Sequence, residues 1–564
     1  MYHSIRRNCK SYKTSFAVIQ SLKKIAGLKL SKIKLYFHSI RYLKWIQIRY
    51  QIWFRLRLKW RYYLKHRYQL TSTSHSASLK FNNWIDKPKT IYGNEFRFFN
   101  LPYKFENNGI VWNYNGLGKL WNYNLNYMDF LLQPNMGKER GIKLINDYIK
   151  KLDNKSIGLE SFPISIRGVN WIKFLSKHGI KNPVIDNSLF AQYKILFDNQ
   201  EYHLLGNHLL ENGFSFLFAG FYFNDSRFFT KAKDIIETEL NEQILTDGGH
   251  FELSPMYHQI ILDRILDCIN LLQNNESFKG QVILLAKMKR KAKLMIRWLN
   301  SVTFSSGQIP MLNDSAPKIA PSTKGINNYA IRLGLITEAL IREVQLHPKM
   351  KDSGFRRING SNYECIMKVG QIGPDYQPGH AHADTFNFEL NLYGKPLIVD
   401  TGISTYEKNE RRQFERGTAA HNTVQINEKD SSEVWDGFRV SRRAHVLHLE
   451  ETDNKIIAKH DGYEYLGIIH ERIFQWDENR LEIIDQVLNK NAKEVVSRFH
   501  FYPNKNLVLV DNKVIFEGGS ATFVGAISIL LNEFQYASEF NKLSPGIVIE
   551  VIFINELISN FEFK

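Results

Sequence analysis

The spacing of apolar residues changes near residue 355, and this change limits the folds open to the chain. Between about residues 95 and 345 the apolar side chains recur every three or four positions, which predicts amphipathic helices. The segment 385–392 instead alternates polar and apolar residues, which predicts a half-buried strand. Helices followed by strands, without alternation of the two, predict a multi-domain α+β chain and not a βαβ fold.

Local sequence signals place several of these elements. Ser254 and Pro255 have the residue types of an N-cap and a first helical position, so we expect a helix to begin there. A second helix, rich in Lys and Arg, is predicted over 287–299. Beyond the turn 393–396, short strands are predicted from 397 and over 507–510, 513–516 and 546–553. We therefore divide the chain into an N-terminal arm (1–70), a Ser/Thr-rich linker (71–94), a helical domain (95–350) and a strand domain (351–564).

The charge of the chain is concentrated in the arm. The formal net charge is +19, but residues 1–70 hold 18 Lys and Arg and no Asp or Glu. The remaining residues are close to neutral. In the arm the basic residues alternate with large apolar ones, as in 52–62, a pattern suited to an anionic membrane surface. A helical arm packed on the body with a solvated basic face remains an alternative. Nucleic acid would attract the same charges, but no recognisable nucleic-acid module follows, so no specific nucleic-acid partner is expected.

The cysteine content and the lengths of the apolar runs indicate where in the cell the protein is located. Cys9, Cys268 and Cys365 are too few and too far apart for a disulfide framework or a CxxC metal motif. No apolar run approaches the roughly 18–20 residues that span a bilayer, and no secretory signal is evident. We therefore expect a chain that is cytoplasmic, or peripheral at the inner face of the membrane.

Three polar clusters could carry chemistry. The first is 206–212, and the second, 247–258, delivers Tyr257 to the first turn of a helix, where the dipole favours phenolate. A packing role for Tyr257 is the alternative. The third combines 379–384 with Asp400 and 421–423. In an extended segment His380, His382 and Asp384 share one face, and His with Asp suits Zn²⁺. Hydrogen-bonded structural histidines are the alternative there.

These clusters resemble the heparinase II/III-like family of polysaccharide lyases. The resemblance covers about 95–564 and also rests on the stretches 120–127, 162–171, 310–315, 399–402 and 416–424. It implies an N-terminal helical (α/α) toroid followed by an antiparallel β-sandwich domain. The stretch 432–440 further resembles members associated with bacterial surface-polysaccharide production.

Family members cleave uronic-acid-containing polysaccharides by β-elimination, and the resemblance assigns roles for this reaction. Asn207 would bind and polarise the substrate carboxylate, with His208 beside it as base or stabiliser. Tyr257 would be the acid, and for one stereochemistry also the base, while His380 would face them from the second domain. The resemblance makes His382, Asp400 and His421 the ligands of a structural metal, expected to be Zn²⁺. The further substrate-binding candidates are Tyr123, Arg167, Arg416 and Arg439. For each of the three arginines, an ordinary salt-bridge role is the alternative.

Two alternatives from other classes stay open at this point. One is a metal-dependent hydrolase that would use His380, His382, Asp384 and His421 around a catalytic metal. It does not explain the motif with Tyr257 or the Asn207–His208 pair. The other is a non-catalytic or accessory membrane-associated protein of surface-polysaccharide assembly, which the lack of a visible secretion signal favours.

Overall fold

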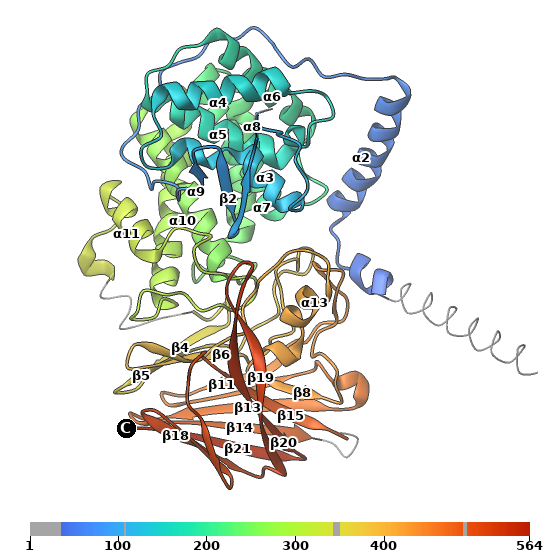
Figure 1. The fold of residues 1–564 in the computed structure, drawn as a ribbon, viewed down its shortest axis with the longest axis vertical. Coiled ribbons are helices and arrows are strands. Elements are labelled where there is room, and N and C mark those ends of the chain that lie inside the picture. Colours follow the sequence, from blue (N-terminus) through green and yellow to red (C-terminus); the bar gives the residue numbers. More distant parts are fainter. Residues whose placement is uncertain (1–34, 107–108, 342–349, 489–492) are drawn as a thin grey trace, which may run out of the picture.

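The computed structural model describes residues 35–106, 109–341, 350–488 and 493–564, and it divides into a helical half and a strand half (Figure 1). The change of period near residue 355 coincides with the boundary, because the first strand of the second half begins at Phe355. The predicted order, a helical toroid followed by a β-sandwich, is therefore confirmed. The helical half and the strand half are stacked along the long axis of the molecule (Figure 1).

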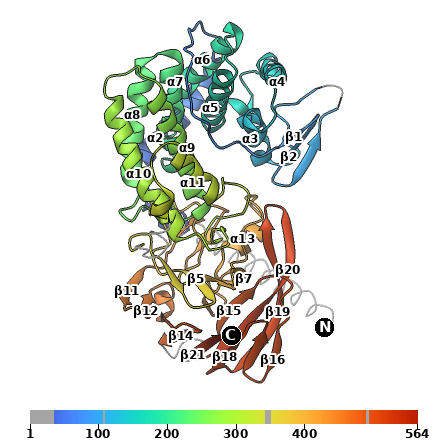
Figure 2. The same cartoon turned by 90° about the vertical axis from the view of Figure 1, so that its left-hand side faces the viewer.

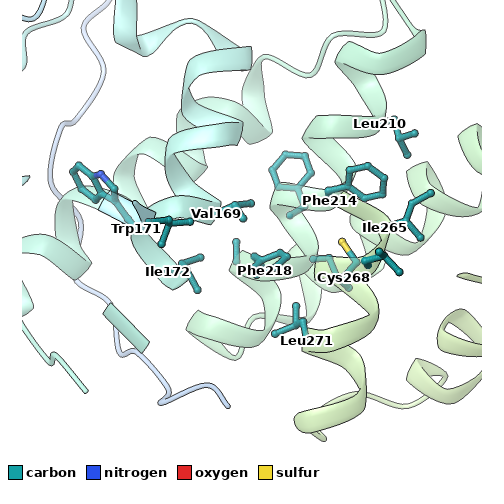
Figure 3. Packing of buried hydrophobic residues seen from close by; sticks show 14 of the residues in the cluster. Val169, Trp171, Ile172, Leu210, Phe214, Phe218, Ile265, Cys268 and Leu271 are labelled. Atoms are coloured by element: carbon teal, nitrogen blue, oxygen red, sulfur yellow. The ribbon is translucent and has the colours of Figure 1, made fainter. Parts of the chain in front are cut away.

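The helical domain packs antiparallel helices around an apolar centre. Helices α5, α7 and α9 contribute Trp171, Phe214, Phe218 and Cys268 to this centre, all at most 1% exposed (Figure 3). A small sheet, β1 (Ile91–Tyr92), β2 (Glu95–Phe98) and β3 (Leu101–Lys104), lies beside it. The helices are α3 (Lys119–Tyr127), α4 (Lys138–Lys151), α5 (Ser161–Lys177), α6 (Pro183–Asp198), α7 (Gly206–Phe223), α8 (Ser226–Gln243), α9 (Pro255–Asn274), α10 (Gln281–Ser301) and α11 (Thr323–Arg332).

The predicted start of α9 is confirmed. Pro255 is its first residue, and the Ser254 hydroxyl accepts a hydrogen bond from the Tyr257 backbone N–H at 3.2 Å. The apolar series that begins at Tyr257 continues through Ile261 and Ile265, which are buried against α7 and α10. The helix predicted over 287–299 is the central part of α10.

The strand domain is a sandwich of two antiparallel sheets. One sheet has the order β11-β12-β13-β14-β21-β18-β17-β16, and the other has β19-β20-β15-β7-β6-β5-β4, with β8 paired to β15. The strands are β4 (Phe355–Asn359), β5 (Tyr363–Lys368), β6 (Phe388–Leu392), β7 (Lys395–Ile398), β8 (Val424–Ile426), β11 (Val446–Glu451), β12 (Lys455–His460), β13 (Ile469–Trp476), β14 (Arg480–Leu488), β15 (Val495–Phe501), β16 (Val508–Val510), β17 (Lys513–Phe516), β18 (Gly519–Val524), β19 (Ser528–Glu539), β20 (Lys542–Phe553) and β21 (Glu556–Phe563). A short helix, α13 (Glu410–Arg416), lies on the side that faces the toroid (Figures 1 and 2). The short pair β9 (Val434–Trp435) and β10 (Arg439–Val440) contacts α13 through β9.

The expectation of a half-buried strand over 385–392 is wrong in one respect. Strand β6 begins only at Phe388, and all of its residues are buried. Phe388 and Leu390 enter the core between the sheets, whereas Glu389 on the other face accepts a hydrogen bond from the Met311 backbone N–H at 2.8 Å. The apolar residues of β6 therefore face the sandwich core, and its polar residues face the helical domain instead of solvent.

The arm and the predicted linker both lie against the toroid. Residues 35–40 are helical, and α2 (Trp45–Tyr63) follows. The segment 71–94 then runs along the helical domain, where Ala77 N–H donates to the Tyr222 carbonyl at 2.6 Å and Lys80 N–H to the Asn275 side chain at 2.9 Å. The segment is thus fixed along its length to the toroid.

A buried ion pair stabilises the sandwich, and its removal gives a test of the fold. Arg472 in β13 donates to both carboxylate oxygens of Asp485 at 2.7 and 2.8 Å, and both residues are fully buried. Arg472 also donates to the Asn422 carbonyl at 2.7 Å. We predict that Arg472→Met lowers the free energy of unfolding by about 3–5 kcal/mol, because Asp485 loses its charged partner. Chemical denaturation measures this loss.

The matched control for this prediction is Arg480→Met in β14. The Arg480 side chain is 44% exposed and pairs with Glu482 at the surface. Its loss should change the free energy of unfolding by no more than about 1 kcal/mol. Equal effects of the two substitutions would contradict the assignment of Arg472 to the core.

Candidate active site

The contact between the two domains is organised around Asp314, which lies in the loop after α10 and is fully buried. Arg412 of α13 donates to its two carboxylate oxygens at 2.5 and 2.7 Å. His380 Nδ1 and His382 Nε2 each lie 2.8 Å from the same carboxylate. Burial alone would raise the pKa of Asp314, but Arg412 and the two histidines hold it well below its usual range. An ionised carboxylate of the helical domain therefore positions three side chains of the strand domain.

Tyr257 and His380 meet across the domain boundary. Their rings stack with centroids 3.8 Å apart, and the Tyr257 hydroxyl lies 3.2 Å from the Tyr406 hydroxyl. Burial, and after it the charge of Asp314, raises the pKa of Tyr257 above its ordinary value. The sequence-based expectation that the helix dipole favours phenolate is therefore corrected, because burial outweighs it. Tyr257 keeps its proton at neutral pH, as a general acid requires.

Asn207 joins this group from the start of α7. Its amide nitrogen donates to Glu252 Oε2 at 2.6 Å, and the same carboxylate oxygen lies 3.9 Å from His380 Nε2. Asn207 and Glu252 are both buried, and burial raises the pKa of Glu252. Asn207, Glu252 and His380 thus form one continuous polar group in contact with Tyr257.

His208 follows Asn207 and has its own carboxylate partner. His208 Nδ1 lies 3.1 Å from Glu201 Oε1, while the other Glu201 oxygen accepts a hydrogen bond from the Asn212 side chain at 3.0 Å. Burial opposes a charge on His208, but Glu201 outweighs it and the pKa of His208 is raised. The His208 side chain is 37% exposed, so a ligand can reach it.

Backbone strain accompanies these residues. Leu205, Leu253 and Asn313 all have positive φ values, of 62°, 56° and 55°, although none is glycine. They lie within two residues of Asn207, Glu252 and Asp314 respectively. Such conformations cost on the order of 1–3 kcal/mol each and persist where the surrounding structure enforces them. The turns that present the polar group are therefore held in place by the packing around them.

The four substrate-binding candidates lie in different environments. Arg167 and Arg416 are fully buried and donate to backbone carbonyls, Arg167 to Gly158 at 2.7 Å and Arg416 to Ala381 at 2.9 Å. This corrects the expectation that they hold acidic sugar groups, because neither guanidinium reaches the cleft. Tyr123 does line a cavity together with His208. Arg439 is 45% exposed and lies over Trp435, with its guanidinium carbon 5.0 Å from the ring centroid.

The predicted metal ligands form hydrogen-bonded pairs. His382 donates to Asp314, and His421 Nδ1 lies 2.7 Å from Asp400 Oδ2, which leaves His382 Nδ1 and His421 Nε2 buried without a described partner. Two free imidazole nitrogens suit a metal, but both Asp400 oxygens already accept hydrogen bonds. Within the described ranges, no three His, Cys, Asp or Glu side chains are arranged to hold an ion. The ligand set of His382, Asp400 and His421 and the structural zinc therefore both stay predictions.

Sequence reasoning assigned no role to Asp314, Glu252, Glu201, Arg412 or Tyr406. Asp314 and Glu252 lie inside stretches already singled out by their polar density, so that density was the available signal. Glu201 and Arg412 act through contacts with residues 7 and 98 positions away, for which the sequence offered no signal.

The two halves of the chain match the two domains of one family. The Heparinase II/III N-terminus family model matches residues 184–332, and the Heparinase II/III-like, C-terminal model matches residues 344–548. Together they cover more than half of the chain, from α6 into β20. The chain belongs to the heparinase II/III-like family.

Individual relatives are distant. A heparin-sulfate lyase of Bacteroides stercoris is 23% identical over 348 residues, which cover 56% of this chain and 50% of the relative. One of Pedobacter heparinus is 24% identical over 297 residues, which cover 47% of this chain and 42% of the relative. The chain thus aligns with about half the length of these curated relatives.

Solved structures show the same fold. A heparinase III structure superimposes with a TM-score of 0.64 at 16% identity, over 82% of this chain and 80% of that one. A heparan sulfate lyase from Pedobacter heparinus has a TM-score of 0.54 at 17% identity, over 83% and 81%. The likeness extends across both domains, so the toroid and the sandwich are the family's architecture.

The pairing of His208 with Glu201 predicts a measurable pKa change. Glu201→Gln removes the negative charge that favours protonated His208, so the pKa of His208 should fall. NMR titration of histidines labelled at Cε1 measures this. The matched control is Glu160→Gln, because Glu160 lines the same cavity but pairs with Lys119 at 3.0 Å. A His208 pKa that is the same in wild type and Glu201→Gln would contradict the pairing.

Proposed function

We propose that this chain is a polysaccharide lyase that cleaves a uronic-acid-containing polysaccharide by β-elimination. The observation that carries the proposal is the convergence of Asn207, Tyr257 and His380 on one polar group between the domains. Family membership supports the reaction class, and the names of the heparin-sulfate lyases support an acidic polysaccharide. The resemblance of 432–440 to members linked with surface-polysaccharide production supports a bacterial surface glycan as the polymer.

The reaction removes the C5 proton beside a carboxylate and expels the C4 substituent. The electrons of the C5–H bond form the C4=C5 double bond, and the C4–O4 bond breaks. The intermediate gathers negative charge on the carboxylate, so catalysis needs donors aimed at that group. The Asn207 amide, held by Glu252, and His208, whose raised pKa favours the cation, suit this role.

Tyr257 suits the proton donor for O4. Its raised pKa keeps the phenol protonated, and the stacked His380, itself bound to Asp314, fixes the ring. A tyrosine that donates to O4 becomes phenolate, and the neighbouring Tyr406 hydroxyl can donate to that anion. The C5 proton needs an acceptor, and His208 takes this role when it starts in its neutral form, because its raised pKa makes that form a stronger base. For a substrate whose C5 proton lies on the same side as O4, Tyr257 would be the base instead: it would start as phenolate, take the C5 proton and return it to O4. The raised pKa of Tyr257 disfavours that starting phenolate, so the route through His208 is the better supported. No step requires a metal-bound group.

Removal of the Tyr257 hydroxyl tests this assignment. We predict that Tyr257→Phe lowers kcat by at least about 100-fold, within the range that general acid–base groups contribute, while the folded state is retained. The assay follows ultraviolet absorbance of the unsaturated product with heparan sulfate and other uronic-acid polysaccharides, and circular dichroism monitors folding. Tyr202→Phe is the control, because Tyr202 packs on α2 outside this polar group.

The outcomes separate the classes of function. New reducing ends without ultraviolet absorbance in wild type would overturn the lyase proposal in favour of a hydrolase. Absence of cleavage of every polymer, including the host's own surface glycan, would favour a non-catalytic role in glycan assembly.

We also propose that the outer face of α2 contacts an anionic membrane surface. No helix of the described part of the chain is long and apolar enough to cross a membrane. On α2, however, Trp45, Ile52, Leu56 and Trp60 recur at helical spacing and are each more than half exposed. Five Arg and Lys and no acidic residue lie in the same helix. Such a face suits the headgroup region of anionic lipid.

Vesicle binding tests the membrane contact. The double substitution Trp45→Ser and Trp60→Ser should weaken binding to phosphatidylglycerol-containing vesicles at least about tenfold, because each lost Trp removes apolar area from the bilayer contact. Co-sedimentation measures binding, with neutral phosphatidylcholine vesicles for comparison. The control is Val282→Ser on α10, which removes a side chain of similar exposure far from α2. Unchanged binding of the double variant would refute the proposal.

A further inference from the structure

Helix α2 encloses a cavity beside the candidate active site. The cavity has a volume of about 640 Å³, within the range of small-ligand pockets. The arm forms one wall, with Phe54, Arg61 and Tyr62, and the toroid forms the other, with Tyr123 and His208. The cavity is therefore lined in part by His208, a residue of the proposed catalytic group.

Specific contacts hold this wall in place on the toroid. The residues on the inner face of α2 recur at helical spacing. They pack on the segment 198–204, which leads into α7. Tyr50 stacks on Tyr202 and Phe54 on His203, each with centroids 4.8 Å apart. Buried Gln47 donates to the Leu204 carbonyl at 3.0 Å. The segment on which α2 packs also includes Glu201, the partner of His208.

The first described residues of the arm contact both domains. Lys44 pairs with Glu242 of α8, and Trp435 of the strand domain donates to the Ser39 hydroxyl at 3.2 Å. Tyr36 lies edge-on to Trp435, with centroids 5.0 Å apart. The arm therefore bridges the toroid and the strand domain on one side of the molecule (Figure 1).

The cavity carries the chemistry of a site for an acidic sugar. Arg61 donates to Asn199 Oδ1 at 2.9 Å, and in the described part of the chain it forms no ion pair with a carboxylate. Lys119 and His66 also line the cavity, as do two carboxylates, Glu160, paired with Lys119 at 3.0 Å, and Glu201, paired with His208. Arg61 is therefore the cation of the lining that no described carboxylate neutralises, and Tyr62, 82% exposed, adds an aromatic ring. Guanidinium groups match carboxylate and sulfate, and flat aromatic rings pack on the apolar face of a sugar.

We infer that α2 and the residues up to His66 supply a subsite for a carboxylate- or sulfate-bearing sugar unit of the polysaccharide, next to the unit held at His208. This inference rests on the proposed function, because it assigns the ligand of the same cleft. The subsite belongs to the arm, and the arm lies outside both segments that match the family. It therefore distinguishes this chain from relatives that share only the toroid and the sandwich.

Two charge substitutions on opposite faces of α2 test the subsite. Arg61→Gln removes a charge from the cavity, and Lys59→Gln removes one from an exposed position that does not line it. The full chain is titrated with a heparan sulfate hexasaccharide by calorimetry, and kcat and KM are measured with heparan sulfate. We expect Arg61→Gln to raise Kd and KM about tenfold, with kcat within about twofold, because one charge-assisted contact is lost. Lys59→Gln should leave all three within about twofold of wild type.

Tyr62→Ala provides a second variant in case loss of the Arg61–Asn199 contact disturbs α2. Tyr62 is almost fully exposed, so its removal leaves the packing of the helix intact. It should raise Kd for the hexasaccharide severalfold without changing the melting temperature. Maltohexaose serves as the neutral probe and should bind none of the proteins.

The results separate this inference from the proposed function. If wild type cleaves and both cavity variants keep wild-type Kd and KM, the subsite is refuted and the lyase proposal stands. If wild type binds the hexasaccharide without cleaving any polymer and the cavity variants lose binding, the subsite stands and the lyase proposal fails. If wild type neither binds nor cleaves, both are overturned.

Discussion

The buried carboxylate of Asp314 holds the two domains together at the candidate site. It belongs to the helical half, yet Arg412, His380 and His382 of the strand half all contact it. An unpaired buried charge costs free energy. The Asp314 carboxylate is therefore stabilised by its partners, and the buried Arg412 cation is stabilised by the carboxylate. The stacking of His380 on Tyr257 follows from that arrangement, because the ring is fixed on one side by Asp314 and on the other by the tyrosine. A site that needs side chains from both domains is thus assembled by the same contact that joins them.

Much of the architecture could be predicted because it depends on local patterns. The cap at Ser254, the helix around 287–299 and the change of period near 355 are each encoded within a few residues. Strand β6 shows where local patterns fail. Its alternation correctly indicated two different faces, but whether the polar face meets water or another domain depends on residues near 311, which are distant in sequence.

The candidate site was predictable in its residue types and less so in its connections. Asn207, His208, Tyr257 and His380 were identified from polar clusters and family resemblance. The carboxylates that hold them were not assigned, because Glu201 and Glu252 owe their roles to packing between helices and turns. Arg167 and Arg416 show the opposite error. Arginine is a common ligand for acidic sugars, but these two satisfy backbone carbonyls inside the fold, and only burial distinguishes the two uses.

The contacts of the arm also constrain the order in which the molecule can assemble. Ser39 meets Trp435 across 396 positions of chain, and Lys44 meets Glu242 across 198. During synthesis the domains emerge from the N-terminal end, and contacts between distant positions form late because their loop closure is costly. The arm is synthesised before the toroid and the sandwich, but its contact with Trp435 can form only after residue 435 has been made. Until then, the basic and aromatic arm lacks its partner on the strand domain and must avoid associating with other molecules. The helix over residues 35–40 is therefore among the last described elements to reach its native position.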